Sequence, residues 1–138
     1  MNSPSEEVKA KSVVWIIDPQ QWPRAYLRAL LLEQGFDVIG FIELGEVLTA
    51  LKNPHSLKPR VIVLELQGLS PSEDQRHTLS QITIPIVGIA GAVERNHEWI
   101  GKIKWAALIE RPATIGQVAD TIKKLTDDGL VKSPCLSS

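Results

Sequence analysis

The chain has 138 residues, the size of one ordinary domain. With 43% apolar and 22% charged residues, it has the composition of a soluble globular protein, and its formal net charge of -1 gives no reason to expect binding to nucleic acid or to an anionic membrane. No apolar run approaches the roughly 20 residues of a membrane helix, and the polar first dozen residues contain no signal core, so we expect a cytoplasmic protein without membrane contact.

Short apolar runs rich in β-branched residues alternate along the chain with segments of helical period. Such near-continuous runs are typical of strands that are covered on both faces. The predicted strands are VVWII at 13–17, VIGFI at 38–42, VIVLEL at 61–66, IPIVGIA at 84–90 and AALI at 106–109. The helical segments lie at 23–35, where Pro23 is a suitable first residue and Gly35 a suitable stop, and at 44–51, 72–81, 92–103 and 115–125.

This order, strand then helix five times, predicts a parallel sheet with helices on both faces. Right-handed crossovers leave few topologies, and a five-stranded unit of this size favours the flavodoxin-like (βα)5 sandwich with strand order 2-1-3-4-5. We expect the domain to span residues 12–126. The polar, Ser-rich segments 1–11 and 127–138 are expected to be a flexible N-terminal segment and a flexible tail or linker stub.

Charged residues stand where three of the predicted strands end. Asp18 follows the first strand, Glu65 ends the third, and Arg111 follows the fifth. In an open parallel sheet, the working crevice lies beyond the carboxyl ends of the strands. We therefore expect these three side chains to converge on one rim.

Over about residues 12–126, the chain resembles the receiver domain of two-component response regulators. VVWIID resembles the first strand of that family with its terminal acid pair, and PRVIVLELQG resembles the third strand with its phospho-accepting aspartate. IPIVGIAG resembles the fourth strand, which ends in Thr or Ser, and ALIERP resembles the fifth, which ends in Lys-Pro.

Several positions depart from what this resemblance implies for a phosphorylation site. The first acid is kept as Asp18, but the second is replaced by a proline, the acceptor by a glutamate, the hydroxyl residue by an alanine and the lysine by an arginine. The proline after that arginine is kept, and the bond before it is expected to be cis as in the family. The degenerate site therefore comprises Asp18, Pro19, Glu65, Ala90, Arg111 and Pro112, and the family's aromatic switch residue falls at Leu108.

These replacements remove what phosphoryl transfer needs. The reaction requires a divalent metal and cations that hold the developing charge, and the loss of a ligand at Pro19 predicts weak or absent Mg²⁺ binding. A residual ion would fall to Asp18, Glu65 and Gln67. The extra methylene moves the Glu65 carboxylate outward by about 1 Å, which costs on the order of 10²-fold in rate. We expect Arg111 to grip Glu65 or Asp18 as an internal cation in place of the metal.

Other interpretations of the same residues remain open. Glu65 and Arg111 are also compatible with ordinary solvated charges, and Asp18 with a cap of the following helix. Glu also imitates a phosphorylated Asp, but Ala90 and Leu108 lack the groups through which the family relays that state.

Residues outside the rim give weaker signals. Trp15 is expected in the core, Trp22 near the pocket, and Trp99, Trp105 and Leu108 on the interaction surface, because tryptophan is enriched at binding hot spots. Partly buried packing is the alternative for both Trp99 and Trp105. We interpret three scattered histidines and a tail cysteine as plain surface residues: His55, His77, His97 and Cys135.

We therefore expect an atypical receiver-like signalling domain that is not an enzyme and needs no cofactor. It would bind a protein partner: a histidine kinase, an output domain, or a second copy in a homodimer. The first alternative is a phosphorylatable response-regulator switch within a phosphorelay. The second is a flavodoxin-like small-ligand-binding domain, which a deep apolar pocket at the rim would support.

Overall fold

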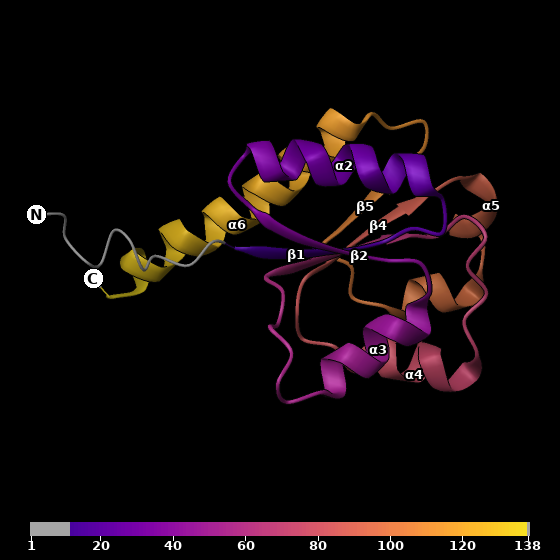
Figure 1. The fold of residues 1–138 in the computed structure, drawn as a ribbon. Helices are drawn as coiled ribbons and strands as arrows, with labels where there is room; N and C mark the ends of the chain where they lie inside the picture. Colours follow the sequence, from indigo (N-terminus) through magenta and orange to yellow (C-terminus); the bar gives the residue numbers. More distant parts are fainter. Residues whose placement is uncertain (1–11, 138) are drawn as a thin grey trace, which may run out of the picture.

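The computed structural model describes residues 12–137, with side chains described up to Asp127. It contains one five-stranded parallel sheet in the order β2-β1-β3-β4-β5, as expected (Figure 1). The strands are β1 (Val13–Ile17), β2 (Asp37–Phe41), β3 (Val61–Glu65), β4 (Ile86–Ala90) and β5 (Ala107–Glu110). The helices are α2 (Gln21–Glu33), α3 (Leu44–Lys52), α4 (Glu73–Gln81), α5 (Ala92–Arg95), the 3-10 helix η1 (Glu98–Lys102) and α6 (Ile115–Ser137).

Helices cover both faces of the sheet, which explains the continuous apolar runs. In Figure 1, α2 and α6 lie above the sheet and α3 and α4 lie below it. Two apolar clusters result, one on each face. Trp15 and Leu64 point to the α3–α4 side, while Ile16 and Val63 point to the α2–α6 side. Successive residues of a strand alternate between the faces, so each central strand contributes to both clusters.

The first helix begins earlier than its sequence predicts. Helix α2 starts at Gln21, two residues before Pro23. Proline is tolerated there because the first four backbone N–H groups of a helix have no partner within it. Gly35 follows the helix with a φ of 95°, a left-handed conformation that favours glycine, as its predicted stop role requires.

The segment predicted as one weak helix over 92–103 divides into two short ones. Helix α5 has four residues, and the 3-10 helix η1 follows it. Only Ile100 of these helices is buried, so neither presents the apolar stripe that packs a longer helix.

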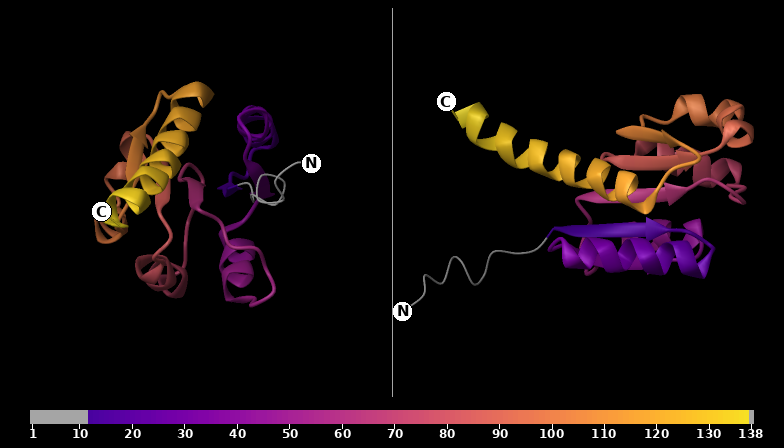
Figure 2. Two further views of the ribbon diagram at one scale, coloured as in Figure 1. Left: turned by 90° about the vertical axis from the view of Figure 1, so that its left-hand side faces the viewer. Right: turned by 90° about the horizontal axis from the view of Figure 1, so that it is seen from above.

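Helix α6 extends well past residue 126, where we expected the domain to end. It continues to Ser137, and Figure 2 shows its last turns projecting beyond the sheet. Polar composition shows that a segment has little to bury, but propagation of an existing helix still adds one hydrogen bond per residue. Residues 1–11 and residue 138 lie outside the described part. Among the described residues, no helix combines the length and apolarity needed to cross a bilayer.

Trp105 fills the space next to the middle of β4, on the face of the sheet that α3 and α4 cover. A Cβ atom at Gly88 would lie 2.8 Å from Cζ3 of Trp105 and 2.8 Å from Cδ1 of Leu108. The indole Nε1 of Trp105 donates a 2.9 Å hydrogen bond to the carbonyl of Ile100, which holds the ring in place. Glycine at position 88 therefore allows the close packing of the β5 side chains on β4.

We predict that Gly88→Ala lowers the free energy of unfolding by about 1–3 kcal/mol, since overpacking displaces two side chains held by the core. Urea denaturation measures this loss as a lower midpoint, with the slope against urea concentration unchanged. Gly101→Ala is the matched control, because a Cβ there meets nothing within 4 Å. Equal midpoints for Gly88→Ala and the unchanged protein would contradict this account of the packing.

Candidate functional site at the strand ends

The parallel register brings Asp18 and Glu65 together. Ile17 of β1 pairs with Leu64 of β3. The residues that follow them, Asp18 and Glu65, therefore lie side by side at the ends of these neighbouring strands. By alternation, both side chains point toward α2 and α6. Asp18, Glu65 and Arg111 line a single cavity of about 240 Å³ at this rim. The expected convergence of the three residues is confirmed.

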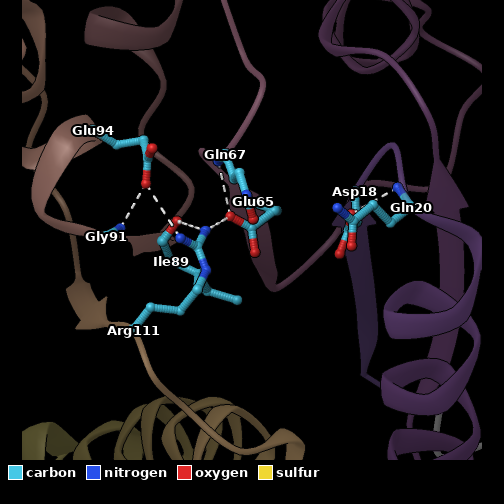
Figure 3. A network of polar contacts seen from close by, with 8 residues as sticks. All are labelled: Asp18, Gln20, Glu65, Gln67, Ile89, Gly91, Glu94 and Arg111. Carbon is cyan, nitrogen blue, oxygen red and sulfur yellow. Dashed lines mark hydrogen bonds and ion pairs between the residues drawn. The ribbon is translucent and has the colours of Figure 1, made fainter.

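Arg111 joins two carboxylates from different strand ends (Figure 3). Its Nη2 pairs with Oε2 of Glu65, and its Nη1 lies 3.2 Å from Oε1 of Glu94. The predicted contact between Arg111 and Glu65 is thus confirmed, as is the cis bond between Arg111 and Pro112. The side chains of Arg111, Glu65 and Glu94 are only 27%, 14% and 17% exposed, so water screens these ion pairs weakly.

Glu94 was missed by the sequence analysis. Its Oε1 accepts a 2.7 Å hydrogen bond from the N–H of Gly91 as well as the contact from Arg111. Gly91 and Glu94 have the spacing of a helix N-cap and the acid three residues later, which is a recognisable start signal. That signal was available in GAVE, but only the fold places this carboxylate beside a residue 17 positions away.

Asp18 is the most buried of the rim acids, with 6% of its surface exposed. Its Oδ1 accepts a 2.9 Å hydrogen bond from the N–H of Gln20, and Nη1 of Arg24 donates to its backbone carbonyl at 2.7 Å. Gln20 is itself the N-cap of α2, which has no side-chain cap, so Asp18 does not cap the helix directly. Burial raises the pKa of Asp18, while the Gln20 bond and the charges of Arg24 and Arg111 lower it in part.

The rim therefore holds three carboxylates and two guanidinium groups. The acids are Asp18, Glu65 and Glu94, and the cations are Arg24 and Arg111. One of these cations and two of these acids were expected from the sequence. Arg24 and Glu94 add one charge of each sign, so the formal charge stays at -1. Within the described residues, Asp18 is the one rim acid whose carboxylate makes no ion pair.

The other residues of the degenerate site do not line the cavity. Pro19 is exposed and borders a separate hollow next to α3, and Pro112 is also exposed. Ala90 is fully buried in the cluster on the opposite face of the sheet. Gln67 reaches the site through its backbone, since its N–H donates to Oε2 of Glu65 at 2.9 Å. Among the described side chains, no group of three or more His, Cys, Asp or Glu is arranged to hold a metal ion.

The predicted interaction residues Trp99, Trp105 and Leu108 are only partly exposed and pack against the core. Trp99 also borders an open cavity of about 480 Å³ between α4 and η1. The aromatic side chains that do face solvent are Trp22 and Tyr26 on α2, which stack with their ring centroids 6.0 Å apart. Trp22, expected near the pocket, is not among the residues that line the rim cavity.

The chain is structurally similar to solved receiver domains. A response regulator receiver protein from Sinorhizobium medicae has a TM-score of 0.67 at 18% identity, with 86% of this chain and 97% of that chain covered. A receiver domain protein from Clostridium thermocellum has a TM-score of 0.68 at 16% identity, covering 87% and 98%. A receiver domain from Methylobacillus flagellatus has 0.62 at 13%, covering 84% and 99%.

No protein-family model matches the sequence, and no curated protein matches it either. At identities this low, the structural neighbours establish the fold alone. The chain therefore has the receiver fold, with the strand order that the sequence predicts.

We predict that Arg111→Ala lowers the free energy of unfolding by about 1–3 kcal/mol, since it leaves two poorly exposed carboxylates unpaired. Chemical denaturation at pH 7 measures the loss. Arg95→Ala is the control: its pair with Glu110 is 45% and 62% exposed, so we expect a loss below about 1 kcal/mol. Equal losses for the two variants would contradict a structural role for Arg111.

Asp18 should make the protein less stable as the pH rises. An acid whose pKa is higher in the folded state keeps its proton up to a higher pH there than in the unfolded state. The free energy of unfolding therefore falls as the pH rises from the ordinary pKa of 3.8 to the folded pKa. Asp18→Asn keeps the acceptor for Gln20 but carries no charge. We predict that it is more stable than the unchanged protein at pH 7 and that this advantage disappears below the ordinary pKa. Denaturation of both proteins at a series of pH values tests this prediction. A stability difference between Asp18→Asn and the unchanged protein that does not vary with pH would contradict it.

Proposed function

We propose that this chain is a receiver-like signalling domain that acts by binding a protein partner, without a cycle of phosphorylation at the acceptor position. The observation that carries the proposal is the Arg111 guanidinium, which is bound to Glu65 at the strand end where the resemblance implies a phospho-acceptor. An internal cation fixed by two carboxylates occupies the acceptor itself.

The acceptor carboxylate is already engaged. Oε2 of Glu65 accepts from the N–H of Gln67 and from Arg111, so this oxygen attacks a phosphodonor only if at least one of these contacts breaks. Mg²⁺ binds through near-octahedral oxygen ligands, and a guanidinium beside Glu65 opposes its approach electrostatically. These contacts support a domain that works without a metal cofactor and without catalysis of its own.

The positions that relay phosphorylation in the family lack the required groups. Ala90 has no hydroxyl to meet a phosphoryl oxygen and is fully buried. Leu108 replaces the switch aromatic and packs against the core beside Trp105. Both substitutions favour a single resting conformation over either a phosphorylated or a permanently active one.

A partner that recognises one fixed surface suits such a domain. The candidates are a histidine kinase, an output domain or a second copy of the chain. Trp99, Trp105 and Leu108 stay the proposed contact region, although their partial burial gives each of them a packing role as well. Exposed Trp22 and Tyr26 add an aromatic pair of the kind enriched at binding hot spots.

Incubation with a small phosphodonor and Mg²⁺, followed by intact mass measurement, tests the central claim. We predict no added phosphoryl group on the unchanged protein. The positive control is a variant with the family's residues restored, Pro19→Asp, Glu65→Asp, Ala90→Thr and Arg111→Lys together, along with a phosphorylatable receiver in the same assay.

A phosphorylated species that disappears in Glu65→Gln would overturn the proposal and favour the phosphorylatable switch. Glu65→Gln is suitable because the amide keeps the size of the side chain while removing its nucleophilic carboxylate.

A further inference from the structure

The rim cavity combines a charged floor with apolar walls. Asp18, Glu65 and Arg111 lie at the strand ends, while side chains of α2, β4 and α6 form the sides. The apolar lining consists of Pro23, Leu27, Ile89, Ala113, Ile115 and Val118. We propose that this cavity binds a primary alkylammonium group, with the nitrogen at Asp18 and Glu65 and the alkyl chain along Leu27, Ile115 and Val118. This goes beyond the proposed function, which assigns the rim no ligand.

The charge of the rim calls for one more cation. The ion pairs of Arg111 account for Glu65 and Glu94, and Arg24 reaches the backbone carbonyl of Asp18 instead of its carboxylate. Asp18 thus has only 6% of its surface exposed and makes no ion pair with the described residues. A buried carboxylate without a direct ion pair costs free energy that a bound cation would recover.

Two carboxylate oxygens remain open to such a cation. The N–H of Gln20 occupies Oδ1 of Asp18, and both donors to Glu65 use Oε2. Among the described residues, no donor reaches Oδ2 of Asp18 or Oε1 of Glu65. An ammonium group has three N–H donors and no acceptor, so it can donate to more than one carboxylate oxygen. Figure 3 shows the two acids as neighbours without a contact drawn between them.

The walls favour an organic cation over a bare metal ion. A divalent ion keeps several waters and needs oxygen ligands around it, whereas Leu27, Ile115 and Val118 offer only methyl groups. Contact with these side chains stabilises a bound alkyl chain in proportion to the apolar area that is removed from water. The cavity of about 240 Å³ is smaller than the roughly 300 Å³ at which sites for drug-sized ligands begin, so it fits a chain of a few carbons.

Two sources can supply this group. One is a free small amine, and the other is a lysine side chain presented by a protein partner. Both place an ammonium on a short alkyl chain at the same two oxygens, so they share one recognition chemistry and differ only in what lies outside the cavity.

The test uses the whole chain titrated with n-butylammonium chloride, followed by backbone amide chemical shifts and by the thermal midpoint. n-Butanol is the neutral analogue, and MgCl₂ at equal ionic strength is the metal arm. We expect saturable shifts at the strand ends and at the start of α6 with n-butylammonium. n-Butanol should bind about tenfold or more weakly, because it lacks the charge that Asp18 attracts.

Asp18→Asn should weaken n-butylammonium binding by about tenfold or more. Asp37→Asn, at an exposed acid at the start of β2, is the matched control and should bind as the unchanged protein does. Equal binding by Asp18→Asn, equal binding of n-butanol, or displacement of n-butylammonium by a more tightly bound Mg²⁺ would each overturn the proposal. The comparison of n-butylammonium with n-butanol decides the question without any variant.

N-acetyl-lysine amide and its side-chain-acetylated form separate the two sources. Binding of the first and not the second supports a lysine from a partner, while binding of n-butylammonium alone supports a free amine. Phosphorylation by a small donor would refute the proposed function without affecting this titration, and a failed titration leaves the phosphorylation result unchanged.

Discussion

The guanidinium of Arg111 between Glu65 and Glu94 is the contact on which the rim is built. It joins the end of β3, the first turn after β4 and the end of β5, three segments that the sheet alone would leave as separate loops. Because all three side chains are mostly shielded from water, the arrangement is stable only when complete: an unpaired acid in such a place costs more than the pair contributes. The ion pairs of Arg111 therefore hold these three segments together.

The same contact changes what the rim can do. A site for phosphoryl transfer must hold negative charge that arrives with the donor, and it relies on mobile cations that come and go with it. Here, the cation is part of the chain and is already bound to acids on both sides. Arg24 adds a second fixed positive charge next to Asp18. Most of the rim's acidic side chains are therefore paired with arginines of the same chain, and Asp18 is the one described rim acid without an ion pair.

Much of the fold and of the rim could be predicted from the sequence, because buried parallel strands have a recognisable apolar pattern. Runs such as VIVLEL are apolar on both faces, and their spacing along the chain determines the topology. Asp18, Glu65 and Arg111 were predictable as neighbours because the carboxyl ends of parallel strands meet at one edge. Glu94 and Arg24 were not, since both lie on helices, and their reach toward the rim depends on side-chain conformation. The start of α2 and the length of α6 were misjudged because Pro23 and a polar composition weaken helices without ending them.

Helix α6 connects the rim to the far end of the molecule. Ile115 and Val118 in its first turn form part of the cavity wall, and its last turns extend past the sheet (Figure 2). Its 23 residues span about 34 Å at 1.5 Å per residue. A stiff rod of that length acts as a lever arm: a tilt of one degree about its first turn moves the opposite tip by about 0.6 Å. A ligand that tilted α6 at Val118 would therefore move the far end of this helix.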